Sequence, residues 1–489
     1  MIRIAVLLIL FSVSFNCFAN HFFISSNQEL QKVLNKVKAG DTIVWKNGMY
    51  KDERILFYPG RNGTEKNPIT LCAESLGKVV FYGNSQLFLS GDYLKIEGFK
   101  FEGDCSLGDG EPVISFSPES SNKYDLPNHC RVTNCAIINY SVTEESGKNN
   151  NYVAMGGTHN ELDHCSFLGK INKGPTVVVN YFENENYIKG SDQAPSTYHH
   201  IHHNYFGYRT YSSNGGEQIR VGVSGTSGTK GFNLIEFNYF EESKIEAEVI
   251  SNKSCNNVYR FNTLVGNDGA LVLRHGTDCI AYGNYIIGNK NNKLSGGIRI
   301  VNPRQLVFNN YIENIEGADR SMRASIVVMS GFEGAGINEY YPADKAIVAY
   351  NTIVNPSGNA IKLSVGNVSK GKSLVAPKDV FFIGNLVQNA NGNSDEPFKN
   401  YDVEASYKLI DNFINNKPVI QGFSELKSGD LKIENGLISI NRSVDSELKT
   451  KIIKKLKSFN IDIDEKDISN FNPDWIISKK NSGASWMNQ

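Results

Sequence analysis

Short strand-like segments, in which apolar and polar positions alternate, recur along most of the chain. Clear examples are LIEFNYFEES, VYRFNTLVGN, CIAYGNYIIGN, LVFNNYIEN, IVAYNTIVN and VFFIGNLVQN. Each places an asparagine between two apolar strands, and the tightest spacings between successive asparagines are 22 to 26 residues. The recurring asparagines are Asn204, Asn238, Asn262, Asn284, Asn310, Asn351, Asn385 and Asn412. The period-two alternation predicts β-strands, and the regular interval predicts a repeat architecture.

The repeat predicts an all-β chain folded as a right-handed, single-stranded parallel β-helix, because no helical segments separate the strands. One coil cannot bury its apolar face alone, so successive coils must stack. Asparagine suits the bend because it tolerates left-handed backbone geometry and because its amide can bond the coils above and below. A leucine-rich repeat would need a leucine-dominated consensus, and a propeller would need blade signatures. The sequence has neither.

The ends of a solenoid need covers. The stretch SSNQELQKVLNKVKAGD predicts an N-terminal cap helix, in which Ser26 and Glu29 form a capping box. The apolar face of this helix comprises Leu30, Val33, Leu34 and Val37. After about residue 424 the repeat is lost, and VDSELKTKIIKKLKSF predicts a lysine-rich amphipathic helix. We therefore expect a β-helix domain at 20–424, which includes the N-terminal cap helix, and a C-terminal cap segment at 425–489.

The first residues, MIRIAVLLILFSVSFNCFAN, combine a positive charge at Arg3, an apolar run and a small residue at Ala19. This pattern is typical of a secretory signal peptide at 1–19, cleaved after Ala19. We expect export to the periplasm or to the medium. The alternative is a retained membrane anchor, although the apolar run is short for a spanning helix. No later segment is long or apolar enough to span a bilayer.

Charge and cysteine content narrow the chemistry further. The formal net charge is −1, so bulk charge indicates no polyanionic partner, and a nucleic-acid partner is not expected. Seven cysteines remain after cleavage, and an odd number argues against a complete disulfide framework. They lack the spacing of a zinc site. Packing cysteines are the preferred interpretation, with a Cys130–Cys135 pair left open.

Charged residues within strand-like segments recur about one coil apart. The steps run from Arg220 to Glu248, then to Arg274, Arg299 and Arg323, with Glu246 beside Glu248. Residues one coil apart lie at the inter-strand spacing of roughly 4.8 Å. The steps therefore predict one row down one face. A row of arginines suits an extended anionic chain such as a polysaccharide, because guanidinium groups bind carboxylates in a bidentate manner. The alternative is a solvated ladder of alternating charges.

The two glutamates interrupt this row. Glu246 and Glu248 point to the same side of a strand, so their carboxylates repel unless a proton or a cation lies between them. Asn214 and Glu217, one coil earlier, add an amide oxygen and a third carboxylate. Such a set of hard oxygen ligands suits Ca²⁺. The alternative is a glutamate pair held by salt bridges to Arg220 and Lys253.

Several of these stretches resemble polysaccharide lyase family six, which includes alginate lyases and the dermatan-cleaving chondroitinase B. The matching stretches are NGGEQIRVG, EAEVISNKS, VYRFNTLVGNDGALVLRHG and GGIRIV, and SGASWM resembles the closing motif of the family. The resemblance covers most of the mature chain and is least clear after about residue 425. It implies a right-handed parallel β-helix that cleaves uronate polysaccharides by β-elimination with Ca²⁺.

The resemblance also implies roles for individual residues. Lys253 in SNKS corresponds to the base, and Arg274 in LRHG corresponds to the acid that protonates or stabilises the leaving oxygen. Asn214, Glu246 and Glu248 correspond to the metal ligands, with Glu217 as a further ligand. Four further residues are assigned to substrate binding: Arg220, His275, Arg299 and Arg323. For His275 an orienting or packing role is an equal alternative.

We expect alginate as the substrate, because NGGE and GGIRI resemble the alginate-cleaving members, whereas EAE resembles the chondroitinase B version. Dermatan sulfate is the alternative, and a non-catalytic carbohydrate-binding β-helix is the second alternative. A β-helix hydrolase would need clustered aspartates, which do not recur at coil spacing. The histidines of YHHIHHNYF alternate between the two faces of a strand, so we expect them to be mostly structural. Lys253 and Arg274 are expected in an exposed groove, where their replacement would leave the fold intact.

Overall fold

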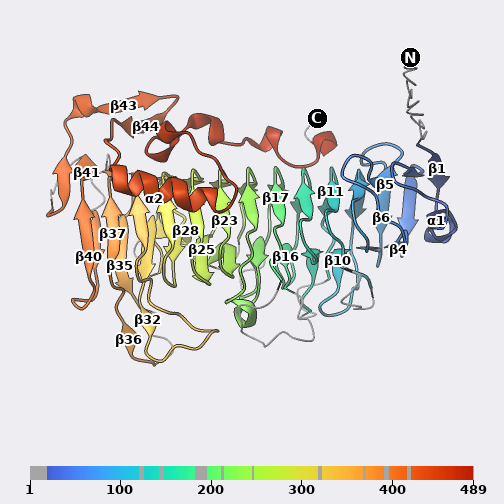
Figure 1. Ribbon diagram of the computed structural model, residues 1–489, viewed down its shortest axis with the longest axis horizontal. Helices are drawn as coiled ribbons and strands as arrows, with labels where there is room; N and C mark the ends of the chain where they lie inside the picture. The colour runs from blue at the N-terminus through green and yellow to red at the C-terminus, as the bar shows by residue number, and fades with distance from the viewer. Residues whose placement is uncertain are drawn as a thin grey trace, which may run out of the picture.

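The computed structural model describes residues 19–119, 126–142, 148–181, 195–210, 214–244, 247–317, 322–366, 371–389, 396–415 and 420–487. The signal peptide predicted at 1–19 lies outside the described residues, apart from its last position. In the described part, three long parallel sheets run side by side along one elongated solenoid (Figure 1). Most coils contribute one strand to each sheet in turn, which confirms the predicted parallel β-helix.

We name the three sheets A, B and C in the order in which the chain visits them. Sheet A consists of β1 (His21–Ile24), β2 (Thr42–Trp45), β5 (Ile69–Ala73), β8 (Leu94–Glu97), β11 (Arg131–Thr133), β14 (Glu161–Asp163), β17 (His200–His202), β20 (Leu234–Glu236), β23 (Val258–Arg260), β26 (Ile280–Tyr282), β29 (Leu306–Phe308), β33 (Ile347–Ala349), β37 (Val380–Ile383) and β40 (Tyr407–Ile410).

Sheet B consists of β3 (Gly48–Lys51), β6 (Val79–Tyr82), β9 (Phe99–Glu102), β12 (Ala136–Ile138), β15 (Ser166–Leu168), β18 (Tyr205–Phe206), β21 (Tyr239–Glu241), β24 (Thr263–Val265), β27 (Tyr285–Ile287), β30 (Tyr311–Glu313), β34 (Thr352–Val354), β38 (Leu386–Gln388), β41 (Asn412–Asn415) and β42 (Phe423–Glu425).

Sheet C consists of β4 (Arg54–Phe57), β7 (Gln86–Leu89), β10 (Pro112–Phe116), β13 (Asn151–Met155), β16 (Val177–Val179), β19 (Ile219–Val221), β22 (Glu248–Lys253), β25 (Gly269–His275), β28 (Ser295–Ile300), β31 (Ile326–Met329), β35 (Ile361–Val365) and β39 (Phe398–Asn400). A small two-stranded antiparallel sheet, β32 (Gly331–Phe332) with β36 (Leu374–Val375), projects beside it.

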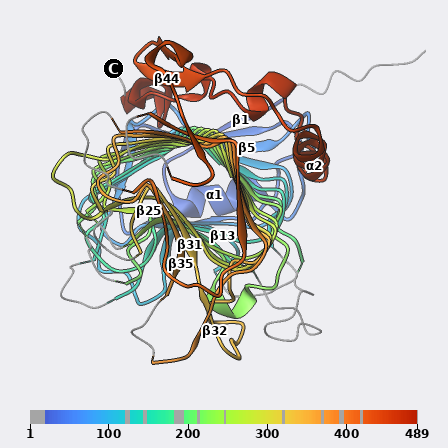
Figure 2. The same cartoon turned by 90° about the vertical axis from the view of Figure 1, so that its left-hand side faces the viewer.

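Inward-facing apolar residues form continuous rows along the solenoid. In sheet C one such row is in register from coil to coil and comprises Ile219, Ile250, Leu271, Ile298, Ile326 and Ile361. Every member of the row is at most 1% exposed. The stacked rows form the core, because each coil covers the apolar face of its neighbour. Figure 2 looks along the solenoid and shows the three sheets around this core.

The eight predicted asparagines form an unbroken ladder at the bend between sheets A and B. Each side-chain amide nitrogen donates to the side-chain oxygen of the next asparagine, from Asn204 to Asn412, at 2.9 to 3.1 Å. One expectation needs correction, because the asparagines themselves are not in the left-handed conformation. The preceding residue is, as at His203 (φ 53°) and Phe261 (φ 55°), and this geometry aims the asparagine amide along the axis.

The N-terminal helix α1 (Asn27–Leu34) covers the first coil, as predicted. Ser26 Oγ accepts from Glu29 N at 3.3 Å, while the Glu29 carboxylate accepts from Ser25 N rather than from Ser26 N. The capping box is therefore displaced by one residue. Leu30 and Leu34 are buried against the core, and α1 is seen across the far end of the solenoid in Figure 2.

The C-terminal segment runs back along the side of the solenoid (Figure 1). It follows the antiparallel hairpin β43 (Leu431–Glu434) and β44 (Leu437–Ile440), and it begins with helix α2 (Ser446–Lys457), which confirms the predicted lysine-rich helix. Its short 3₁₀ helices are η6 (Glu465–Ile468), η7 (Pro473–Trp475), η8 (Lys479–Asn481) and η9 (Ser485–Met487); η2 (Ser224–Thr226) and η5 (Ser428–Asp430) lie elsewhere.

Both ends of this segment pack against the solenoid, and the closing motif SGASWM lies at its second end. Leu448, Ile452 and Leu456 of α2 are buried against the outer face of sheet A. At the other end, Trp486 Nε1 donates to the carbonyl of Asn134 at 2.9 Å. The segment predicted as a C-terminal cap thus contacts many coils along one edge.

Two further expectations can be checked. The seven cysteines of the described residues are all free thiols, so Cys130 and Cys135 do not form a disulfide, and the packing interpretation is confirmed. Among the described residues, no helix has both the length and the apolar character needed to cross a membrane.

Candidate active site on sheet C

Five charged side chains from consecutive coils meet on the outer face of sheet C. We call them the charged cluster: Glu217, Glu248, Lys253, Arg274 and Arg299. Glu217 lies two residues before β19, and Glu248 and Lys253 begin and end β22. Arg274 is the penultimate residue of β25, and Arg299 lies within β28. The parallel stacking of the coils therefore brings together residues that are up to 82 positions apart in the sequence.

Lys253 forms a buried ion pair with Glu217. Its Nζ donates to Glu217 Oε1 at 3.3 Å, and the two residues are 8% and 0% exposed. The expectation that Lys253 lies in an exposed groove is therefore wrong, because the flanking coils cover most of its side chain. The second carboxylate oxygen of Glu217 is buried and has no hydrogen-bond partner among the described residues.

Glu248 is bound by the two arginines of the charged cluster. Its Oε1 accepts from Arg274 Nη1 at 3.1 Å and from Arg299 Nη2 at 2.5 Å, and its Oε2 accepts from Ser251 Oγ at 2.5 Å. Burial alone would raise the pKa of Glu248, but Arg274, Arg299 and Lys253 lower it to about 2. Glu248 is therefore a buried carboxylate at neutral pH, compensated by three cations.

His275 and Tyr340 form the apolar edge of the cluster. His275 is paired in register with Lys253, and its ring lies 5.7 Å from that of Tyr340. Burial, followed by the charges of Arg274 and Lys253, lowers the pKa of His275 to about 3, so the imidazole is neutral at neutral pH. The Arg274 guanidinium lies 6.0 Å from the Tyr340 ring centroid, which holds its side chain over the strand.

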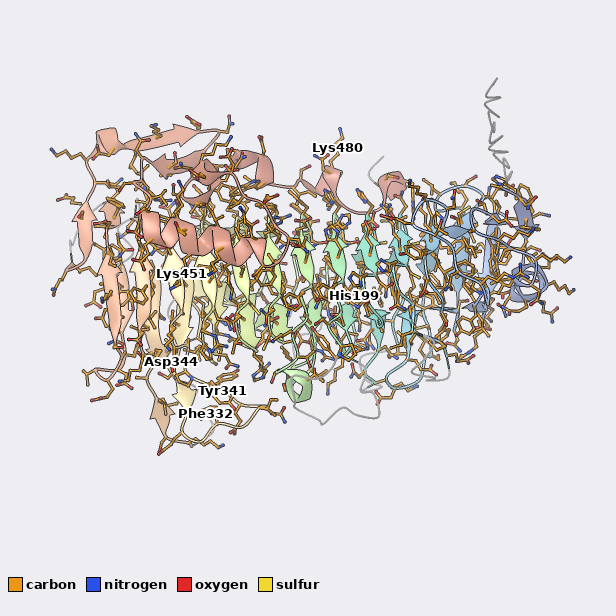
Figure 3. The ribbon with its side chains drawn as sticks, viewed as in Figure 1. His199, Phe332, Tyr341, Asp344, Lys451 and Lys480 are labelled. Atoms are coloured by element: carbon orange, nitrogen blue, oxygen red, sulfur yellow. The ribbon has the colours of Figure 1, made fainter. Side chains whose placement is uncertain are left out.

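Tyr340 belongs to an extension that leaves the solenoid between β31 and β33. The extension contains β32 and pairs with β36, and Figure 3 shows Phe332 and Tyr341 projecting from the lower edge of the solenoid. Ser227 Oγ donates to the carbonyl of Ile337 at 2.8 Å, so the extension is anchored to the coil that carries β19. It forms a wall beside the charged cluster.

The predicted single row of charges is not what the structure shows. Arg220 is in register with Ser251, Glu248 with Ala270, and Arg299 with Val272. The reason is physical: β-bulges in β22 and β25 shift the register between Glu248 and Ile250 and between Asn252 and Lys253. The charges consequently gather in a cluster and not in a ladder.

The other predicted site residues are not joined to this cluster by an ion pair described above. Arg220 is half-buried on β19, in register with Ser251 of the neighbouring coil. Asn214 is exposed in the turn that leads to β19. Arg323 donates to the main-chain carbonyl of Leu294, which directly precedes β28. Glu246 lies outside the described residues.

Sequence reasoning missed two members of the site. Ser251 hydrogen-bonds Glu248 from the middle of β22, and a serine in a strand carries no distinctive signal. Tyr340 had a usable signal, because the spacing from Asn310 to Asn351 is 41 residues and implies an insertion that carries the pair Tyr340–Tyr341. Long insertions between regular coils commonly carry functional residues.

Two carboxylates on this face are of the donor type that calcium prefers. The carboxylates of Glu217 and Glu248 are hard oxygen ligands, and the buried, unpartnered oxygen of Glu217 is a position where a cation would compensate a charge. Arg274, Arg299 and Lys253 currently compensate the two carboxylates. An ion at this position would therefore compete with these three cations.

Comparison with known proteins assigns the chain to a family. A family model described as Chondroitinase B matches residues 24–462. The chain belongs to the chondroitinase B family. The resemblance inferred from the sequence is thereby confirmed. The match includes all five residues of the charged cluster, and it excludes the last part of the segment that runs back along the solenoid.

Solved structures of known lyases are similar to this chondroitinase B family member. The PL6 family alginate lyase AlyGC is 31% identical with a TM-score of 0.79, and the alignment covers 95% of this chain but 58% of AlyGC. A mannuronic acid specific polysaccharide family 6 lyase from human gut microbiota is 24% identical with a TM-score of 0.71, and the alignment covers 96% of both chains. Pedsa3628 from Pseudopedobacter saltans, a PL6 family polysaccharide lyase, is 22% identical with a TM-score of 0.65, covering 95% and 99%.

The last two relatives support the β-helix fold alone, because their identity to this chain is low. This chain spans 58% of the length of AlyGC. No curated protein sequence matches the chain.

Proposed function

We propose that the protein is a polysaccharide lyase that cleaves alginate by calcium-assisted β-elimination and leaves 4,5-unsaturated uronate ends. The observation that carries this proposal is the charged cluster, where Lys253 and Arg274 are held on adjacent coils by Glu217 and Glu248. AlyGC, the 31% identical relative, is an alginate lyase, which supports alginate as the substrate. The NGGE and GGIRI stretches support the same substrate.

Lys253 and Arg274 supply the two functions that β-elimination needs, a base and a group that stabilises the leaving oxygen. The neutral amine of Lys253 removes the proton at C5 of a uronate, the electron pair forms the C4–C5 double bond, and the bond from C4 to the glycosidic oxygen breaks. Arg274 donates a hydrogen bond to the leaving oxygen, which receives its proton from the guanidinium or from water. A positioned base contributes on the order of 10²–10⁴ in rate.

The C5 proton is weakly acidic because the neighbouring carboxylate is already negative. Glu217 and Glu248, together with Asn214 and Glu246, would hold the Ca²⁺. The ion supplies charge compensation to the uronate carboxylate as negative charge develops there. Lys253 pairs with Glu217 in the structure, and its amine can accept the C5 proton only in the neutral form, free of this ion pair.

Four further residues are proposed to bind the substrate: Arg220, His275, Arg299 and Arg323. His275 is neutral and adjacent to Lys253, so it suits a hydrogen bond to a hydroxyl group of the sugar. Its Nδ1 is buried and has no hydrogen-bond partner among the described residues. Arg220 and Arg299 share one outward row of sheet C, with Ser251 and Val272 between them. Three inter-strand spacings of roughly 4.8 Å separate them, so they suit the carboxylates of two sugars that are not neighbours in the bound chain.

Dermatan sulfate is the second candidate substrate, because the matching family model is that of chondroitinase B and because EAE resembles its version of the site. We also propose export to the periplasm or the medium with cleavage after Ala19, on the basis of the N-terminal apolar segment. An extracellular location would bring the enzyme to its polymeric substrate.

The substrate proposal is tested by incubating the calcium-loaded protein with alginate, separated mannuronate and guluronate blocks, and dermatan sulfate. Ultraviolet absorbance of unsaturated uronate is expected with alginate. Absorbance with dermatan sulfate alone would replace the substrate and retain the mechanism. Excess chelator should abolish the activity and added Ca²⁺ should restore it. Full activity in chelator would refute the calcium role.

A further inference from the structure

A second cluster of ligating side chains lies on the outer face of sheet A, on a different sheet from the charged cluster. His200 and His202 are two positions apart on β17, so both side chains point to the same face. Glu161 on β14 is in register with His200, and Glu236 on β20 is in register with His202. Three consecutive coils therefore present two imidazoles between two carboxylates.

The carboxylates contact the imidazoles diagonally. His202 Nε2 lies 2.8 Å from Glu161 Oε1, and His200 Nε2 lies 2.9 Å from Glu236 Oε1. The ring centroids of His200 and His202 are only 3.9 Å apart. The ligand atoms of Glu161, His200 and His202 all lie within 4.8 Å of one another.

The surroundings hold this arrangement in place. His202 Nδ1 lies 2.8 Å from His203 Nδ1, which fixes the ring from its other nitrogen. Glu236 is paired with Arg260, and Glu161 Oε1 lies 3.6 Å from Arg131 Nε. Glu161 is the carboxylate whose ligand atom lies within 4.8 Å of those of both imidazoles.

Solvent reaches the cluster. The side chains of His200 and Glu161 are 37% and 33% exposed, whereas that of His202 is 11% exposed. A small ion can therefore enter from solvent and meet two imidazole nitrogens and one carboxylate oxygen.

We propose that Glu161, His200 and His202 form a binding site for a divalent transition-metal ion of the zinc class. Imidazole nitrogen combined with one carboxylate suits Zn²⁺, Ni²⁺ or Cu²⁺, whereas Ca²⁺ takes oxygen ligands. Ligands at about 2.0–2.2 Å from Zn²⁺ lie at most about 4 Å apart, so small side-chain rotations close the site. The expectation that these histidines are mostly structural then holds for His199, which is buried, and not for His200 or His202.

The interaction of His203 with His202 is the kind of outer contact that orients a metal-ligating histidine. The site needs neither Lys253 nor Arg274 and is independent of the proposed lyase activity. Its occupancy would tie two adjacent coils together, those of β14 and β17, and stabilise the solenoid through binding to the folded state.

The test is isothermal titration of the untagged mature chain, stripped with chelator, with ZnCl₂. One Zn²⁺ per chain is expected at micromolar affinity, together with a visible absorption band of bound Co²⁺ in a parallel titration. His200→Ala and His202→Ala should each weaken Zn²⁺ binding at least tenfold, and Glu161→Gln should weaken it severalfold. CaCl₂ should not compete.

The matched control is His129→Ala, because His129 is a histidine of the same solenoid that is stacked between Tyr93 and His159 and is not part of the ligand group. This variant should bind Zn²⁺ like the wild type. His200 is the more exposed ligand, so His200→Ala is expected to remain folded. Absence of Zn²⁺ binding by the wild type, or equal binding by wild type, His200→Ala and His202→Ala, would overturn the proposal and leave the cluster as hydrogen-bonded ion pairs.

Discussion

Replacement of Lys253 should cost stability as well as activity. Lys253 is 8% exposed and pairs with Glu217, which is fully buried. Removing one partner of a buried ion pair leaves an uncompensated charge and typically costs about 3–5 kcal/mol. Lys253→Met removes the amine while keeping most of the side-chain volume. We therefore expect a loss of about 3 kcal/mol or more in the free energy of unfolding, measured without calcium.

The assay is urea unfolding at pH 8 of the wild type, Lys253→Met, Glu217→Gln and the double variant. Each single variant should be destabilised, and the double variant should recover much of the loss, because it removes both charges. Catalytic activity should not recover in the double variant. It should stay at least about a hundredfold below that of the wild type, since the base is absent.

The control is Lys95→Met, which breaks the half-buried pair of Lys95 and Glu97, whose side chains are 28% and 27% exposed. A pair that solvent reaches in this way is worth about 1 kcal/mol. If Lys253→Met were no more destabilising than Lys95→Met, or if the double variant were as unstable as the sum of its singles, the buried ion pair would not have the role inferred from the structure.

Three other perturbations test separate parts of the account. Asn284→Ala removes three donated and two accepted side-chain hydrogen bonds. At about 1 kcal/mol for each bond, the free energy of unfolding measured in urea should fall by about 3–5 kcal/mol. The control Asn62→Ala, at an exposed position, should cost less than about 1 kcal/mol. The folded-state pKa of Glu248 is about 2, below its usual value of 4.5, so its ionised form stabilises the fold by about 3 kcal/mol. This stabilisation is fully present above pH 4.5 and is lost as the pH falls toward 2. The unfolding free energy of Glu248→Gln should therefore depend less on pH across that window, and an equal pH dependence in wild type and variant would contradict the assignment. Arg274→Lys keeps the charge and loses the planar fork, so kcat should fall at least tenfold while the calcium affinity measured by titration changes little; unchanged kcat would remove Arg274 from the reaction.

The repeat in the sequence was sufficient to predict the fold. A parallel β-helix needs the same residue type at the same place in each coil, so the eight ladder asparagines stand out as a periodic signal along the chain. The association of Lys253, Glu248 and Arg274 was predicted for the same reason, because residues about one coil apart must lie close together. The family motifs supplied the roles that spacing cannot supply.

The finer geometry could not be predicted, because the periodicity fails at the site itself. Bulges in β22 and β25 break the register where the charges lie, so counting residues places Glu248 opposite Arg274 when its register partner is Ala270. The burial of Lys253 and its pairing with Glu217 depend on side-chain packing between coils. Tyr340 comes from an insertion, which has no equivalent position in the repeat.

The proposed mechanism leaves a chemical signature that neither a hydrolase nor a binding protein produces. The decisive measurement is the initial rate of unsaturated-uronate formation from alginate, followed by ultraviolet absorbance together with the release of reducing ends, for calcium-loaded wild type and Lys253→Arg of verified fold. The wild type should produce both signals in parallel, and Lys253→Arg should be slower by about a hundredfold or more, since it retains the charge but lacks an accessible neutral amine. Reducing ends without ultraviolet absorbance, or a Lys253→Arg rate equal to that of the wild type, would contradict elimination by Lys253.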